Sequence, residues 1–124
     1  MCGFLNRPKQ RSGEVAAVDV KRLEIDKLAY AIAMAETKNC TLGYGEMYNN
    51  CFGIKSGNTA PCKNVGQNRM CIYDHPEESY TAFRKIWQTW YKGFPTTEMA
   101  SRWTGSDRPD SWLRNVRYYY NNVG

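Results

Sequence analysis

The cysteines constrain the fold more than any other feature of this sequence. Four of the five lie within one polar, Gly/Asn-rich segment: Cys40, Cys51, Cys62 and Cys71. No C-x-x-C pair occurs and only His75 is placed to complete a zinc site, so we expect no metal and favour disulfides formed in an oxidising compartment. Of the three possible connectivities we favour the pairs adjacent in sequence, Cys40–Cys51 and Cys62–Cys71. Cys2 is left over.

The composition predicts one globular domain. Hydrophobic residues make up 42% of 124 residues, enough to bury an ordinary core. We divide the chain into an N-terminal arm, residues 1–17, and a domain, residues 18–124. No run of about 18 apolar residues exists, so no membrane span is expected. The first five residues are too short for the apolar part of a signal peptide.

Hydrophobic periodicity predicts a mainly helical domain. The expected helices run from near Asp19 to about Lys38, over 46–54, over 77–92, from Thr96 or Thr97 to about Trp103, and from Pro109 to Asn121. Residues 55–71 carry no amphipathic pattern and predict at most a two-stranded hairpin, with a turn near 64–66. An aromatic stripe in the third helix is interpreted as core: Tyr80, Phe83, Trp87 and Trp90. The fold class is therefore α+β, mainly α, with a small irregular or β lobe.

One carboxylate shares a face with core residues. At about 100° per residue, Ile25, Ala29, Ile32 and Glu36 fall on a single stripe of the first long helix. Partial burial and the negative end of the helix dipole would both raise the pKa of Glu36, as a general acid requires. The alternative is a solvent-edge residue paired with Lys38 or a backbone donor. The spacing alone does not choose between them.

The residues after Glu36 favour a sugar-binding cleft. Aromatic and amide side chains follow in loops, where function is often carried: Tyr44, Tyr48, Asn49, Asn50 and Phe52. The net charge of +5 and the pI near 9.0 favour an anionic partner such as a bacterial cell wall. The positive residues are scattered, so we expect no nucleic acid partner. The alternative is that the charge only keeps the domain soluble.

These residues carry a family resemblance. A helix ending Ala-x-x-x-Ala-Glu is followed by Tyr-Asn-Asn-x-Phe-Gly-Ile-Lys at 48–55, and then by Tyr-Asp-His-Pro-Glu-Glu-Ser-Tyr at 73–80. Both resemble segments of the lysozyme-like superfamily, most similarly the N-acetylglucosaminidases of glycoside hydrolase family 73, of the flagellar muramidase and autolysin type. A weaker match covers 103–116. The resemblance spans roughly residues 25–120 and implies a lysozyme-like fold.

The resemblance implies specific roles for several residues. Glu36 would be the general acid that protonates the glycosidic oxygen between N-acetylated amino sugars of peptidoglycan. Asn50, Phe52 and Gly53 would shape the floor of the cleft, and Tyr48 would contact substrate. We add Tyr44, from the aromatic loop, and Tyr119, close to where the family carries a cleft tyrosine on its late helix. We expect an extracytoplasmic monomer that needs no cofactor.

Two departures from the family leave the mechanism open. The segment from Ser56 to Met70 contains no Asp or Glu, although family members usually carry a second acid there, and Trp112 stands at the expected tyrosine position. Glu46 is the nearest remaining candidate for a second acid. Without a partner, Glu36 would serve as acid and then base, which is similar to lytic transglycosylases and goose-type lysozymes. A second alternative is a non-catalytic cell-wall-binding or structural domain.

Overall fold

The computed structural model describes the backbone of residues 13–57 and 61–122, with side chains from Ile25 onward. It is mainly helical, with one two-stranded sheet. The elements, in chain order, are α1 (Gly13–Thr37), α2 (Gly43–Tyr48), β1 (Asn64–Val65), the 3₁₀ turn η2 (Gln67–Arg69), β2 (Cys71–Ile72), α3 (Pro76–Ile86), the π-helical turn η3 (Trp87–Tyr91), α4 (Thr97–Thr104) and α5 (Asp110–Asn121). The predicted α+β, mainly α class is confirmed.

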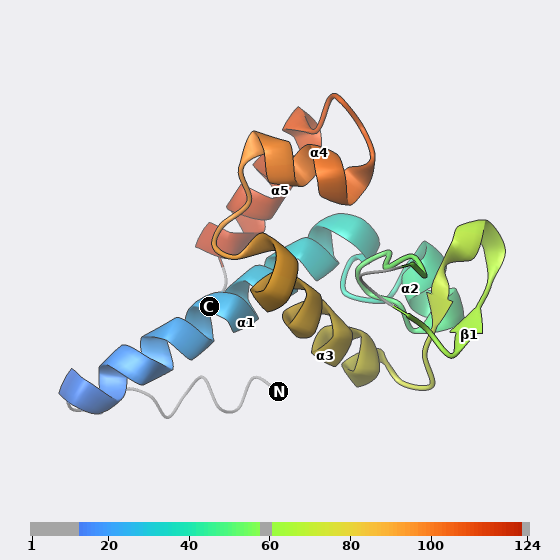
Figure 1. Ribbon diagram of the computed structural model, residues 1–124. Helices are drawn as coiled ribbons and strands as arrows, with labels where there is room; N and C mark the ends of the chain where they lie inside the picture. The colour runs from blue at the N-terminus through green and yellow to red at the C-terminus, as the bar shows by residue number, and fades with distance from the viewer. Residues whose placement is uncertain (1–12, 58–60, 123–124) are drawn as a thin grey trace.

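Helix α1 runs from the lower left of Figure 1 into the centre of the molecule, and α5 packs along it. Helices α2 and α3 also contact α1, and α4 packs against α5. We call α4 and α5 the helical lobe, and residues 43–57 and 61–73 the small lobe. In Figure 1 the two lobes lie at different sides of the C-terminal end of α1, above it and to its right. No helix of the described residues is long and apolar enough to cross a membrane.

The first helix begins earlier than predicted. It starts at Gly13 rather than near Asp19, so residues 13–17, predicted as part of the arm, are helical. The cause is helix propensity, since Glu14, Ala16 and Ala17 are all strong helix formers and extend the helix before Asp19. The rest of the predicted arm, with Cys2, lies outside the described residues.

The hairpin of the small lobe also differs in register. Asn64 and Val65, predicted to form its turn, are instead strand β1, paired antiparallel with β2 through Asn64–Ile72 and Val65–Cys71. The chain reverses at Gly66–Met70, where Asn68 has a left-handed φ of 54°. Asparagine tolerates that conformation better than most residues. The predicted helix over 46–54 likewise starts and ends earlier, because Asn49 turns left-handed (φ 55°) and terminates α2.

Both predicted disulfides are formed. Cys40 is bonded to Cys51 and Cys62 is bonded to Cys71. The first joins the turn after α1 to the loop after α2. The second lies within the small lobe and joins the segment before β1 to β2. An isolated hairpin of this size is marginally stable at best, so the covalent bridge stabilises a lobe with little apolar surface of its own.

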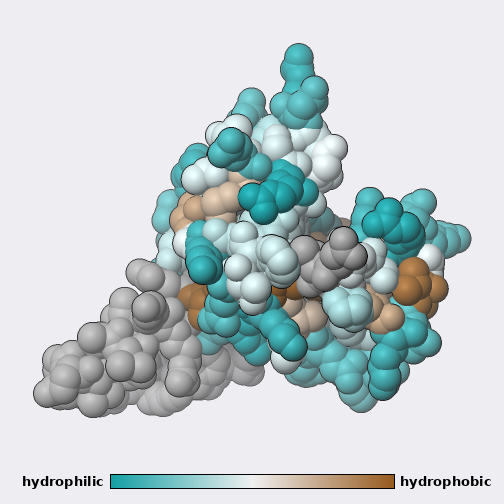
Figure 2. Space-filling view, viewed as in Figure 1, coloured by the Kyte–Doolittle hydropathy of each residue, from teal (hydrophilic) through white to brown (hydrophobic). Residues whose placement is uncertain are grey.

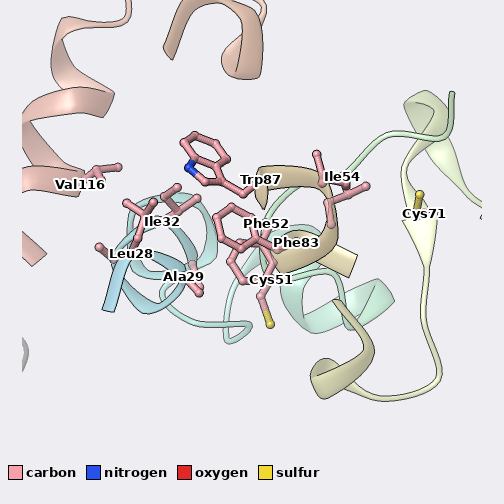
Figure 3. Packing of buried hydrophobic residues seen from close by; sticks show 13 residues of the cluster. Leu28, Ala29, Ile32, Cys51, Phe52, Ile54, Cys71, Phe83, Trp87 and Val116 are labelled. Carbon is pink, nitrogen blue, oxygen red and sulfur yellow. The ribbon is translucent and has the colours of Figure 1, made fainter. Parts of the chain in front are cut away.

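The core is a stack of aromatic rings. Phe52 lies parallel to Phe83, with ring centroids 4.5 Å apart, and Phe83 stacks on Trp87 at 5.3 Å. All three side chains are almost completely buried. Figure 3 shows these rings with α1 side chains, Leu28 among them, on one side and Ile54 on the other. The core thus joins α1, α3 and the loop after α2.

One member of the predicted aromatic stripe is not in the core. Trp90 is 52% exposed, whereas Tyr91 stacks on Trp87 with ring centroids 4.4 Å apart. The reason is the change from α- to π-helix at Trp87, marked by the bond from Lys92 N–H to the Trp87 carbonyl at 2.7 Å. A π-helical turn holds one more residue than an α-helical turn. The residue that faces the core is therefore Tyr91, where α-helical spacing predicts Trp90.

Candidate active site

Glu36 stands in the last turn of α1, whose end has an unusual backbone. The amides of Lys38 and Asn39 donate to the carbonyls of Met34 and Ala33, at 3.1 and 2.9 Å, and satisfy carbonyls that a helix end leaves free. Lys38, Asn39 and Cys40 all have positive φ, of 51°, 57° and 71°. Left-handed backbone is costly for residues other than glycine, so the surrounding contacts must hold this run in place.

Thr37, directly after Glu36, supplies several of these contacts. Its buried hydroxyl donates to the carbonyl of Cys51 and accepts from the amide of Cys40, both at 2.8 Å. Helix α2 packs closely here, since a Cβ placed on Gly45 would lie 2.7 Å from the Cβ of Thr37. Only glycine fits at that position. Together with the Cys40–Cys51 disulfide, these contacts join the base of Glu36 to the small lobe.

The Glu36 carboxyl lies where both lobes meet. From α5, the indole N–H of Trp112 donates to Oε2 at 2.8 Å. From α4, the side chain of Trp103 also acts to lower the pKa of the carboxyl, with a smaller effect than that of Trp112. From the small lobe, a Cβ placed on Gly53 would lie 3.5 Å from Oε1, and Gly53 has a left-handed φ of 69°. Segments distant in sequence therefore surround one carboxyl group.

Burial raises the pKa of Glu36 above its ordinary value of 4.5. The hydrogen bond from Trp112 and, more weakly, the nearby Trp103 act in the opposite direction, because they stabilise the charged form, but desolvation is the larger effect. A carboxyl held in this way keeps its proton to a higher pH than a solvated one. It is therefore suited to act as a proton donor.

No protein-family model, curated protein or solved structure matches this chain. The function proposed below is therefore drawn from the side chains around Glu36 and from the sequence.

Asn50 and Phe52, predicted to shape the floor of a cleft, are fully buried in the structure. The amide of Asn50 donates to the carbonyls of Ile54 and Cys71, at 2.9 and 3.0 Å, and its oxygen accepts from the amide of Ile54 at 3.0 Å. Asn50 thereby fixes the loop that carries Gly53. Phe52 packs in the aromatic core. Both shape the site from beneath, by holding the backbone of Gly53 beside Glu36.

The two predicted tyrosines of α2 join that helix to the hairpin. Tyr44 and Tyr48 stack with ring centroids 5.7 Å apart. The Tyr44 hydroxyl accepts from the side chain of Asn68 at 2.8 Å, and the Tyr48 hydroxyl accepts from the amide of Gln67 at 3.1 Å. A Cβ on Gly66 would collide with the Tyr48 ring, so glycine is required there. Both rings remain partly exposed on the small lobe.

The structure does not place Glu46 or Tyr119 against the Glu36 carboxyl in any contact of the described residues. Glu46 is exposed in the first turn of α2, where the positive end of the helix dipole stabilises a negative charge. Tyr119 is half-buried and packs against the core with its ring near Tyr118. Glu78, in the first turn of α3, accepts from the backbone amide of Asp74 at 2.8 Å.

Sequence reasoning missed Trp103 and Trp112 as partners of Glu36. The family tyrosine was expected at the position of Trp112. This correspondence is the one signal in the sequence that points to Trp112 as a partner of Glu36. For Trp103 no local pattern signals the contact, because it depends on how α4 packs. Among the described residues, no group of three His, Cys, Asp or Glu side chains is placed to hold a metal ion.

The raised pKa of Glu36 predicts a pH-dependent stability difference. The folded state keeps a proton that the unfolded chain releases above pH 4.5, so this carboxyl costs stability progressively as the pH rises from there through its raised pKa. Glu36→Gln removes the ionisation. We expect the free energy of unfolding of Glu36→Gln, minus that of the native chain, to increase between about pH 4 and pH 7. Urea denaturation across this range measures it, and a difference that stays constant or shrinks would contradict the buried carboxyl.

Proposed function

We propose that this chain is a peptidoglycan-cleaving glycosidase of lysozyme-like fold. It acts on the β-1,4 linkage between N-acetylated amino sugars, with Glu36 as the general acid. The observation that carries the proposal is the desolvated Glu36 carboxyl, held at the end of α1 between Trp112 of the helical lobe and Gly53 of the small lobe. A glycosidic bond is cleaved when such an acid protonates the leaving oxygen.

Two lobes flank the end of α1, an arrangement suited to an extended substrate. Figure 2 shows the helical lobe at the top and the small lobe at the right. A glycan strand lying between these lobes would pass the end of α1, where Glu36 is located. The partly exposed rings of Tyr44 and Tyr48 on the small lobe are suited to contact pyranose faces. The net charge of +5 favours the anionic cell wall.

Lytic transglycosylation is a second candidate, favoured by the lack of an evident partner acid. The segment from Ser56 to Met70 contains no carboxylate, and Glu46 is exposed on α2. In this reaction Glu36 first gives its proton to the glycosidic oxygen, and the electron pair of the broken C1–O bond goes to that oxygen. The resulting carboxylate then accepts the proton of the sugar's own 6-hydroxyl, whose oxygen bonds to C1 and forms a 1,6-anhydro ring.

The same features support an extracytoplasmic site of action. Two disulfides stabilise the end of α1 and the small lobe, and such bonds persist in oxidising compartments. The proposed substrate is found outside the cytoplasm as well. A non-catalytic cell-wall-binding domain would keep the fold and the affinity for glycan strands but give no cleavage products.

Product analysis tests the proposal. The native chain, with its disulfides intact, is incubated with purified peptidoglycan, and the soluble fragments are identified by mass spectrometry. Reducing ends on amino sugars would support hydrolysis, and 1,6-anhydro ends would support lytic transglycosylation. If the chain sediments with peptidoglycan but releases no fragments, the enzyme proposal is wrong and the binding domain is favoured.

A further inference from the structure

We propose that Trp112 is a positioning residue which holds Oε2 of Glu36 so that Oε1, beside Gly53, is the oxygen that donates the proton. This inference rests on the function proposed above and identifies how its acid is oriented. It follows from one hydrogen bond, one glycine and the donor-only chemistry of an indole ring.

The indole N–H makes the two carboxyl oxygens unequal. Its nitrogen donates a hydrogen bond and cannot accept one. The Trp112 N–H lies 2.8 Å from Oε2, so that oxygen acts as an acceptor. In a protonated carboxyl the carbonyl oxygen is the better acceptor of the two. The proton is therefore directed to Oε1.

Oε1 faces the small lobe at a position without a side chain. A Cβ on Gly53 would stand in ordinary contact with Oε1 at 3.5 Å, and the left-handed φ of 69° also disfavours any residue but glycine. Glycine at this position places no side-chain atom of its own against Oε1 on the side of the small lobe. A glycosidic oxygen approaching there meets the protonated oxygen of Glu36.

The proton leaves Oε1 for the glycosidic oxygen, and the electron pair of the C1–O bond goes to that oxygen. Glu36 is then a carboxylate, whose charge the Trp112 N–H stabilises at Oε2. The oxygen of water or of the sugar's 6-hydroxyl bonds to C1, and the proton that it loses passes to the Glu36 carboxylate or to solvent water. The same donor thus orients the acid before the transfer and stabilises its anion afterwards.

Uncharged groups from each neighbouring element contact the carboxyl: Trp112 from α5, Trp103 from α4 and Gly53 from the small lobe. Lys38 follows Glu36 closely in sequence, after the end of α1, and Glu46 lies on α2, which packs against α1. Both of these charged side chains are exposed. The hydrogen bond from Trp112 opposes the effect of burial on the Glu36 pKa.

The direction in which the pKa of Glu36 changes in the variant Trp112→Phe distinguishes positioning from a merely structural role. The variant keeps an aromatic ring but loses the N–H, so we expect the pKa of Glu36 to move upward. The alkaline limb of the pH–rate profile should follow it to higher pH, while kcat falls about tenfold. Simple loosening of the site would admit water and move the pKa downward. The pKa is measured by ¹³C NMR of the Glu36 carboxyl carbon, in the intact oxidised chain.

Trp87→Phe is the matched control. Trp87 donates its indole N–H to the carbonyl of Gly93 at 2.7 Å, so the same chemical change removes a bond of similar length elsewhere. We expect this variant to leave the pKa of Glu36 unchanged. If Trp112→Phe lowers that pKa or leaves it unchanged, the inference is overturned.

A measurement on the native chain needs no substitution. The indole N–H resonance of Trp112 should titrate with the same midpoint as the Glu36 carboxyl carbon, and a resonance that does not respond overturns the inference. These NMR readouts do not depend on turnover. If peptidoglycan is cleaved while they fail, only the role of Trp112 is wrong. If no fragments are released, the proposed function fails, and this role with it.

Discussion

Replacing Glu36 by glutamine is expected to lower the rate of peptidoglycan cleavage by about 10²–10⁴-fold, the usual contribution of a positioned general acid. Glutamine has nearly the same shape, and its side-chain oxygen can still accept the hydrogen bond from Trp112. The loss would therefore come from the missing proton. Release of soluble fragments from purified peptidoglycan measures the rate, and circular dichroism verifies that the variant is folded.

Glu46→Gln is the matched control, because it makes the same chemical change at an exposed position on α2. If Glu36 works without a second acid, this variant should retain the native rate. A rate loss as large as that of Glu36→Gln would identify Glu46 as a partner and favour a two-carboxylate hydrolase. Equal cleavage by the native chain and Glu36→Gln would remove Glu36 from the mechanism.

Replacing Phe52 by alanine is expected to destabilise the fold by about 3–5 kcal/mol, the usual cost of truncating a buried phenylalanine. Phe52 is completely buried, stacks on Phe83 at 4.5 Å and meets Tyr80 edge to face at 4.8 Å. The substitution removes these contacts and leaves a cavity at the junction of the core with the small lobe. Urea denaturation of the oxidised chain, monitored by circular dichroism, measures the change in the free energy of unfolding.

Phe94→Ala is the control for this prediction. Phe94 is 38% exposed and contacts the ring of Tyr120 at 5.2 Å, so the same truncation should cost much less. Equal losses at the two positions would contradict the central place of Phe52 in the core. A second variant, Phe52→Leu, keeps most of the buried volume. Near-native cleavage by Phe52→Leu would agree with a structural role, whereas a lost rate with retained stability would favour substrate contact.

The helical framework was largely predictable because its signals are local. Periodicity placed α3, α4 and α5. Of the two residues predicted to begin α4, Thr96 or Thr97, Thr96 is the N-cap, and its hydroxyl accepts from the amide of Met99 at 3.1 Å. Trp90 was placed in the core wrongly, because the π-helical turn that exposes it has no clear sequence signature. The hairpin register was wrong for a similar reason, as left-handed Asn68 is one of several asparagines in that segment.

The candidate site was only partly predictable. Helical spacing placed Glu36 on an apolar face, and the disulfides that join its surroundings were paired correctly. The resemblance suggested that Asn50 and Phe52 border a cleft, but pattern matching does not report depth, and both lie beneath the surface. The contact of Trp112 with Glu36 joins residues from opposite ends of the domain and depends on how α5 packs along α1.

The left-handed run after α1 bears on the motion of Glu36. Helix ends ordinarily fray, and a side chain in the last turn moves with them. Here three successive positive-φ residues are held by the Thr37 hydroxyl, by the Cys40–Cys51 bond and by Tyr80, whose hydroxyl donates to Asn39 at 2.5 Å. Fraying would have to break the hydrogen bonds and move the disulfide-linked segments together, so we expect this helix end to fray less than an ordinary one. We therefore expect the Glu36 side chain to keep its position although it lies in the last turn of α1.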